Sequence, residues 1–90
     1  MWDIYETKLV TKQVEKLPWE IARKYKAWIE IVKLRGHSSL LHYPGFKDEA
    51  LVGKLKGCRS SRLNLQFRVI YSQVKGKKEL IVLRITPHRY

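Results

Sequence analysis

Three runs of strand-forming residues follow one another closely in the second half of this sequence. They span residues 59–63, 67–73 and 79–86, and they are rich in β-branched and aromatic side chains. The connections between them are short, and the second one contains Gly76, which suits a hairpin loop. Short connections join antiparallel neighbours, so these runs predict a small sheet, with the nearly all-apolar last strand lying centrally.

The first half of the sequence predicts one short strand and two helices. Residues 2–6 favour a strand, and residues 7–17 have the apolar spacing of a short amphipathic helix. A second helix begins at Pro18 and ends before Gly36, with an apolar stripe formed by Ile21, Tyr25, Trp28 and Val32. The sequence therefore predicts an α+β fold in which a two-helix hairpin packs on a small twisted, mainly antiparallel sheet. Residues 37–49 have no clear period and predict a loop, in which residues 38–41 could form one helical turn.

Length and composition limit the kind of protein this can be. Ninety residues allow one domain, spanning residues 1–90, and 44% apolar residues allow a small core. The single cysteine, Cys58, excludes an internal disulfide framework, and no apolar run is long enough to span a membrane. The first residues lack the features of a signal peptide, so we expect a cytoplasmic protein. The three histidines are scattered, and we expect no metal and no cofactor.

The charge is strongly positive and unevenly distributed. The whole chain carries a net charge of +11, of which +3 belongs to residues 1–46 and +8 to residues 47–90. Five cations and no acid lie between Gly53 and Arg68. A run of one sign repels itself unless an anion lies nearby, so polyanions are the expected partners.

The first hairpin of the predicted sheet places two of these cations together, if its turn has three residues. With residues 64–66 in the turn, Arg62 lies directly opposite Arg68, on the side of the sheet away from the helices. Like charges in such a pair destabilise a sheet, whereas two guanidinium groups match the oxygens of a phosphate. A two-residue turn would instead place Arg62 opposite Phe67, and in either register both arginines could simply be solvated.

Four segments carry a resemblance to a known family. They are residues 44–51, the lysine-rich turn 54–57, the arginine-containing segment 59–64 and the Phe-Arg-Val-Ile-Tyr segment 67–71. In this order, after a two-helix first half, the sequence resembles the RelE/ParE superfamily of bacterial toxins from toxin–antitoxin systems. The resemblance implies a RelE-like, microbial-RNase-like fold and, for many members, a ribosome-dependent endoribonuclease that cuts mRNA in the ribosomal A site. It also implies a cognate antitoxin as a partner.

The resemblance further implies which residues catalyse the reaction and which bind RNA. The catalytic candidates supply a general base, cations for the phosphate and a general acid, and they are Glu49, Lys54, Arg62, Arg68, His88 and Tyr90. The candidates for RNA binding are cations around them, namely Lys47, Lys56, Arg59 and Arg89. Glu49 is the expected base with Lys54 as the alternative, and His88 or Tyr90 is the expected acid. Such a site attacks the phosphodiester with the 2′-hydroxyl of the RNA itself, and so needs no metal.

Two other functions remain open at the level of sequence. The ParE branch of the same superfamily inhibits DNA gyrase and is not a nuclease, which would leave the basic cluster and residues 88–90 without a catalytic role. A non-catalytic RNA- or ribosome-binding domain would tolerate changes at Glu49 or His88. Cleavage of mRNA in cells would distinguish an endoribonuclease from both alternatives.

Overall fold

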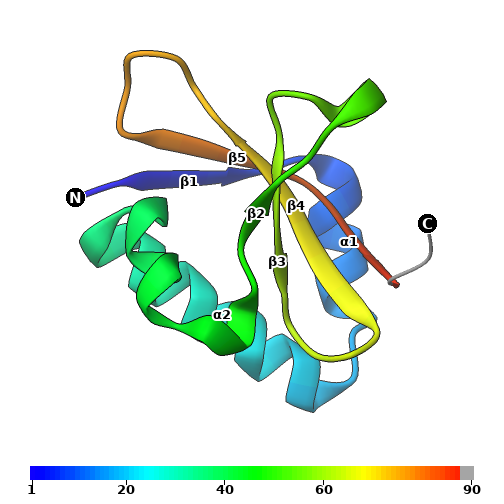
Figure 1. Cartoon of the computed structure of the whole chain (residues 1–90). Coiled ribbons are helices and arrows are strands. Elements are labelled where there is room, and N and C mark those ends of the chain that lie inside the picture. Colours follow the sequence, from blue (N-terminus) through cyan, green and yellow to red (C-terminus); the bar gives the residue numbers. More distant parts are fainter. Residues whose placement is uncertain (88–90) are drawn as a thin grey trace.

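The computed structural model, in which residues 1–87 are described, contains one five-stranded sheet (Figure 1). The strand order is β1-β5-β4-β3-β2, with β1 parallel to β5 and every other pair antiparallel. The strands are β1 (Asp3–Glu6), β2 (Glu49–Ala50), β3 (Arg59–Arg62), β4 (Phe67–Gln73) and β5 (Glu79–Pro87). The sheet is thus mixed, and its first and last strands in the chain lie side by side.

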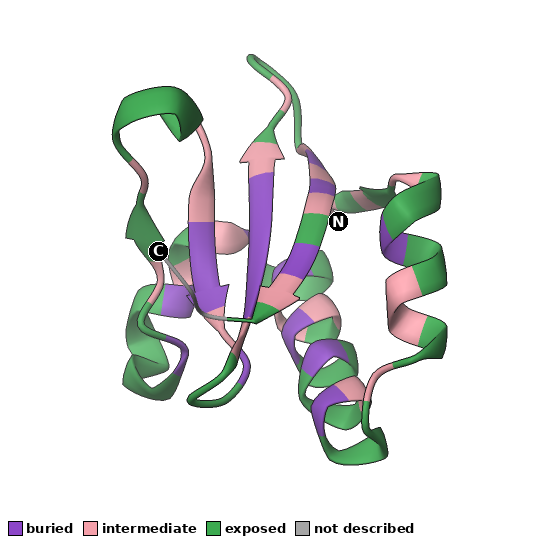
Figure 2. Ribbon diagram, turned by 90° about the vertical axis from the view of Figure 1, so that its right-hand side faces the viewer, coloured by how far each residue is buried: buried purple, intermediate pink, exposed green. Residues whose placement is uncertain are grey.

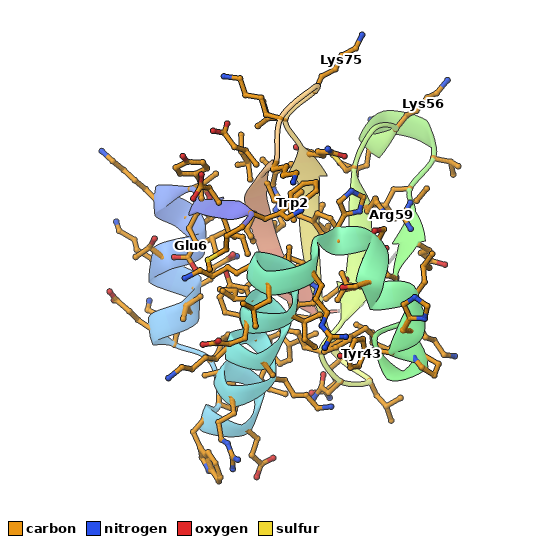
Figure 3. All side chains as sticks on the ribbon, turned by 90° about the vertical axis from the view of Figure 1, so that its left-hand side faces the viewer. Trp2, Glu6, Tyr43, Lys56, Arg59 and Lys75 are labelled. Atoms are coloured by element: carbon orange, nitrogen blue, oxygen red, sulfur yellow. The ribbon has the colours of Figure 1, made fainter. Side chains whose placement is uncertain are left out.

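Within residues 1–87, two α-helices and three short 3-10 helices accompany the sheet. They are α1 (Lys8–Glu15), α2 (Trp19–Arg35), η1 (His37–His42), η2 (Pro44–Phe46) and η3 (Gly53–Leu55). Helix α2 lies in front of the sheet in Figure 3, and Figure 2 shows the sheet from the opposite side. We call the side under α2 the helix face. The other side, which carries Arg62, Arg68 and Arg84, we call the arginine face.

The core lies on the helix face. The apolar stripe of α2 is buried as predicted, with Trp28 fully covered and its ring 5.2 Å from that of Tyr71. Val69, Leu80 and Val82 are also completely buried there. The Thr7 hydroxyl caps α1, and Tyr25 on α2 donates a hydrogen bond to Glu6 at the end of β1. Alternating apolar residues thus decide which side of each strand α2 covers.

Most predicted elements are confirmed to within one or two residues. The three-residue turn is confirmed: Asn64 Oδ1 accepts hydrogen bonds from the backbone of Gln66 and Phe67, at 2.8 and 2.7 Å. Strand β5 is interior, as expected, but the middle position of the sheet belongs to β4. The segment predicted as a loop contains two 3-10 helices, and β2 begins at its last residue, Glu49.

No helix within residues 1–87 is both long and apolar enough to cross a membrane.

Candidate active site

The arginine face holds a directly opposed pair of guanidinium groups. Arg62 on β3 pairs with Arg68 on β4, so the predicted register is confirmed. The Arg68 side chain is only 6% exposed, which is unusual for a cation in so small a protein. Burying a charge costs free energy unless polar or oppositely charged groups contact it. The groups around Arg68 therefore define the site.

Two side chains hold Arg68 in place. Its Nη1 donates to Glu49 Oε1 and to the Ser60 hydroxyl, each at 3.1 Å. Glu49 pairs with Ser60 across β2 and β3, so both side chains point to the arginine face. The Glu49 side chain is 58% exposed. The carboxylate is therefore tied to a fixed cation on one side and remains accessible to a ligand on the other.

Arg62 has unused hydrogen-bonding capacity. Its Nε is buried from solvent, and no atom of residues 1–87 accepts a hydrogen bond from it. A buried donor without an acceptor is uncommon and costs free energy. Guanidinium groups present their donors in a planar fork that matches phosphate oxygens, so the opposed Arg62 and Arg68 suit a phosphate.

A third cation, Arg84, reaches this face because of an irregularity in β5. Strict alternation from Leu80 and Val82 would turn Arg84 towards the core. The register between β4 and β5 shifts between Ile70 and Tyr71, so Arg84 pairs with Ile70 and points to the arginine face. Nothing in the sequence indicates that Arg84 belongs to this face, because its place there depends on that bulge.

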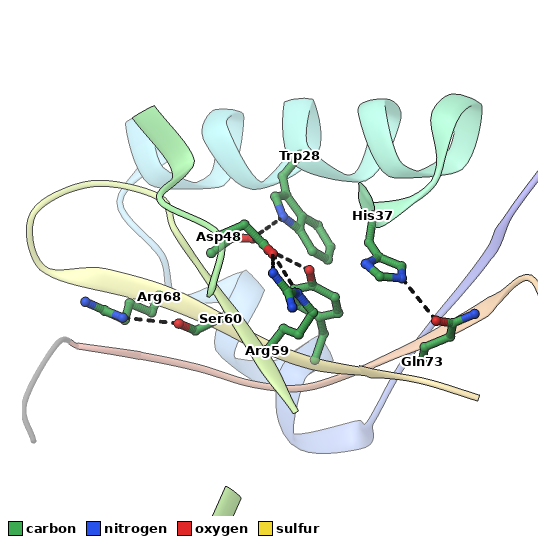
Figure 4. A network of polar contacts seen from close by, with 9 residues as sticks. Trp28, His37, Asp48, Arg59, Ser60, Arg68 and Gln73 are labelled. Carbon is green, nitrogen blue, oxygen red and sulfur yellow. Dashed lines mark hydrogen bonds and ion pairs between the residues drawn. The ribbon is translucent and has the colours of Figure 1, made fainter. Parts of the chain in front are cut away.

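Behind Glu49, on the helix face, Asp48 is a buried hub of hydrogen bonds (Figure 4). Its side chain is 1% exposed, and Arg59 Nε and Nη2 both lie 2.7 Å from its Oδ1. Ser61 and Tyr71 both donate hydroxyl hydrogen bonds to its Oδ2, and Trp28 Nε1 donates to the Ser61 hydroxyl. The two-residue strand β2 is thereby fastened to β3, β4 and α2, which fixes where Glu49 points.

This hub changes the ionisation of its members. Burial and then the hydrogen bond and charge of Asp48 raise the pKa of Tyr71 well above its ordinary value, with Arg59 opposing in part. Burial by itself lowers the pKa of Arg59, but the hydrogen bond and charge of Asp48 outweigh it and raise that pKa. Tyr71 therefore stays a donor, and Arg59 stays a cation committed to Asp48.

The structure does not gather all the predicted cations at the arginine pair. Arg59 points to the helix face, where it pairs with Asp48. Lys54 and Lys56 are exposed on and after η3, beyond the end of β3 that is farther from Arg62. Lys47 is exposed and has a positive φ of 42° at the turn before Asp48. Of the predicted catalytic residues within the described part of the chain, Glu49, Arg62 and Arg68 lie together.

Comparisons with known proteins address the fold. No protein-family model matches the chain, and no curated protein matches it significantly. Among solved structures, RelE of the RelE–RelB complex from Pyrococcus horikoshii is similar, with 24% identity and a TM-score of 0.75 over 96% of this chain and 93% of that one. The YoeB–YefM complex from Staphylococcus aureus gives 16% identity and a TM-score of 0.74 over 99% of both chains. This protein has the RelE toxin fold. A YoeB/ParE toxin from Agrobacterium tumefaciens is also similar, with 20% identity and a TM-score of 0.73 over 97% of this chain and 99% of that one.

The RelE-like fold agrees with the predicted fold class and covers essentially the whole chain. Three predicted residues, His88, Arg89 and Tyr90, lie outside the described residues. The last described residue, Pro87, pairs with Phe67, the neighbour of Arg68. Within residues 1–87, no group of three or more His, Cys, Asp and Glu side chains is placed to hold a metal ion.

Proposed function

We propose that this protein is the toxin of a toxin–antitoxin pair and that it cleaves mRNA on the ribosome. The observation that carries the proposal is the contact between the accessible Glu49 carboxylate and the buried Arg68 guanidinium, opposite Arg62. The RelE-like fold supports it, since similar structures include toxins bound to their antitoxins. A cognate antitoxin is the corresponding partner that we propose here.

The proposed reaction uses the 2′-hydroxyl of RNA as the nucleophile. Glu49 takes the proton of that hydroxyl, O2′ forms a bond to phosphorus, and the bond from phosphorus to the 5′-oxygen breaks. A general acid, His88 or Tyr90, protonates the leaving oxygen. The products are a 2′,3′-cyclic phosphate and a 5′-hydroxyl end. Glu49 is favoured as the base over Lys54, because Glu49 lies beside the arginine pair.

The arginine face supports the charge that develops in this reaction. The phosphorane carries more negative charge than the substrate, and preorganised cations stabilise it without further rearrangement. Arg68 is held by Glu49 and Ser60, so its guanidinium is oriented before substrate arrives. Arg62 lies directly opposite Arg68, and Arg84 adds a further positive charge on β5. Lys47 and Arg89 keep their proposed roles in RNA binding.

The first test replaces the proposed base without disturbing the fold. Glu49→Gln keeps the size of an exposed side chain but removes the proton acceptor, so we expect cleavage to fall at least about 100-fold. Primer extension on a reporter mRNA, from cells briefly expressing each variant, measures the new 5′ ends. Glu30→Gln, an equal change on an exposed part of α2, is the control and should cleave like the wild type.

The outcomes separate the proposed function from its alternatives. Discrete ends within translated codons, absent when translation is blocked, support a ribosome-dependent nuclease. Cleavage by Glu49→Gln at the wild-type rate would show that Glu49 is not the base. Growth arrest without new RNA ends would favour a ParE-type action on gyrase, and neither arrest nor cleavage would favour a binding domain.

A further inference from the structure

Two neighbouring serines on β3 face opposite sides of the sheet, and both are buried. Ser61 belongs to the Asp48 hub on the helix face, whereas Ser60 lies on the arginine face and contacts Arg68 (Figure 4). Ser60 is only 1% exposed. Water therefore does not compete with its hydroxyl for the contact with Arg68, which makes that contact stronger than one at the surface.

One nitrogen of Arg68 joins Ser60 to the proposed base. Nη1 of an arginine carries two hydrogens, and here Glu49 Oε1 and the Ser60 hydroxyl each lie 3.1 Å from it. The three side chains come from three neighbouring strands, β2, β3 and β4. Two acceptors on one terminal nitrogen fix the plane of the guanidinium group, because turning the group would break both contacts.

The two acceptors differ in what happens to them during the proposed reaction. Glu49 takes the proton of the 2′-hydroxyl and becomes neutral, so its contact with Arg68 changes from an ion pair to an ordinary hydrogen bond, which is weaker. In the same step the phosphorane gains the negative charge that Arg68 is to stabilise. Ser60 is neutral before and after the proton transfer, so its contact with Arg68 does not weaken.

We propose that Ser60 is a positioning residue that keeps Arg68 directed at the phosphate while Glu49 loses its charge. This role rests on the proposed function, because it belongs to the same reaction step. In a Ser60→Ala variant, Nη1 keeps Glu49 as an acceptor, but that acceptor weakens in the step that most needs an oriented cation. The effect of Ser60 is therefore on the transition state and not on the binding of RNA.

Single-turnover cleavage of a reporter mRNA on purified ribosomes, at rising protein concentrations, separates these two effects. Ser60→Ala removes the acceptor, and Ser60→Cys keeps nearly the same volume with sulfur, a weak acceptor. Losing a hydrogen bond to a charged group costs a factor of about 10 to 100, so both variants should lower the maximal rate by up to that factor. The half-saturating concentration should stay unchanged. Ser72→Ala, on the same face of β4, is the control and should cleave like the wild type.

The outcomes distinguish a failure of this role from a failure of the proposed function. A wild-type protein that does not cleave would overturn the proposed function, and the role of Ser60 with it. A wild type that cleaves, beside a Ser60→Ala variant with the same maximal rate, would overturn the role of Ser60 alone. An unchanged maximal rate with a raised half-saturating concentration would overturn it too, because Ser60 would then act in binding.

A measurement without substrate tests the orientation of Arg68 directly. Nitrogen-15 NMR of the guanidinium groups measures how fast each group rotates, and the same spectra show that each variant is folded. Rotation of the Arg68 group should be about 10-fold faster in Ser60→Ala than in the wild type. The group of Arg35, exposed at the end of α2, should rotate equally fast in both proteins. Equal rates for Arg68 would overturn the proposal even if cleavage fell, because the hydroxyl would then not hold the guanidinium.

Discussion

At the scale of single residues, Asp48 contributes most to the geometry of the candidate site. Its hydrogen-bond partners Arg59, Ser61 and Tyr71 lie 11, 13 and 23 positions later in the chain. The sequence predicts that Arg59, Ser61 and Tyr71 lie on neighbouring strands, but Asp48 falls in a segment without periodicity. The sequence around Asp48 does not indicate that its side chain is buried, so the hub could not be predicted. Its neighbour Glu49 was predicted, as a catalytic candidate.

The protonated Tyr71 hydroxyl of this hub predicts a loss of stability at high pH. The pKa of Tyr71 is raised in the folded protein, so its stabilising effect is complete below the ordinary tyrosine pKa of about 10 and is lost as pH rises further. The free energy of unfolding should therefore fall above about pH 10, by up to about 1.4 kcal/mol per pH unit for this one group. Urea unfolding followed by circular dichroism measures it.

Two variants separate Tyr71 from the general effect of high pH on a lysine-rich chain. Tyr71→Phe should lose stability less steeply above pH 10 than the wild type, because its side chain has no proton to release. Tyr43→Phe, at a more exposed position, should keep the wild-type slope. If both variants followed the wild type, Tyr71 would not be the group that titrates.

At the scale of elements, the regular segments could be predicted and the short ones could not. Alternation along residues 67–73 and the three-residue turn determine that Arg62 faces Arg68, and both follow from local chemistry. Strand β2 has only two residues, too few for any period, and tertiary contacts hold it. The bulge that turns Arg84 to the arginine face is likewise a property of two strands together, not of β5 alone.

The end of α2 offers a test of how the elements are joined. Gly36 has a φ of +80°, and a Cβ placed there would lie 2.7 Å from Nε1 of Trp2. Gly36→Ala would therefore combine an unfavourable backbone conformation with a clash, and should lower the free energy of unfolding by about 1–3 kcal/mol. Gly45→Ala is the control, because its Cβ would meet no atom within 4 Å, and it should change stability little. Equal stabilities for the two variants in urea unfolding would contradict this account.

At the scale of the whole molecule, charge is separated from the core. The sequence predicted a basic second half, and the structure divides its cations: Arg62, Arg68 and Arg84 lie on the arginine face, whereas Lys54 and Lys56 lie before the other end of β3. That division could not be predicted from the sequence, because Lys54, Lys56 and Arg62 are close along the chain. They are separated in space only because β3 runs between the two lysines and Arg62.

A net charge of +11 on 90 residues should make stability depend on salt. Repulsion between like charges weakens as the Debye length falls from about 10 Å at 0.1 M to about 3 Å at 1 M, so added NaCl should raise the free energy of unfolding. The increase should be smaller in Lys56→Glu/Lys75→Glu, which reduces the net charge by four. A decrease in the wild type would mean that ion pairs such as Arg59–Asp48 outweigh the repulsion.

The position of β5 also has a consequence for the order of folding. Strand β5 lies between β1 and β4, yet a ribosome makes it after the other four strands. A nascent chain that has emerged only through β4 has β1 without its partner, and the core lacks Leu80, Val82 and Ile85. Contacts between distant parts of a chain form slowly, because a long loop must close first. The newly made protein therefore has neither a complete sheet nor a finished arginine face until its final strand is inserted, which delays any activity until synthesis of that strand is over.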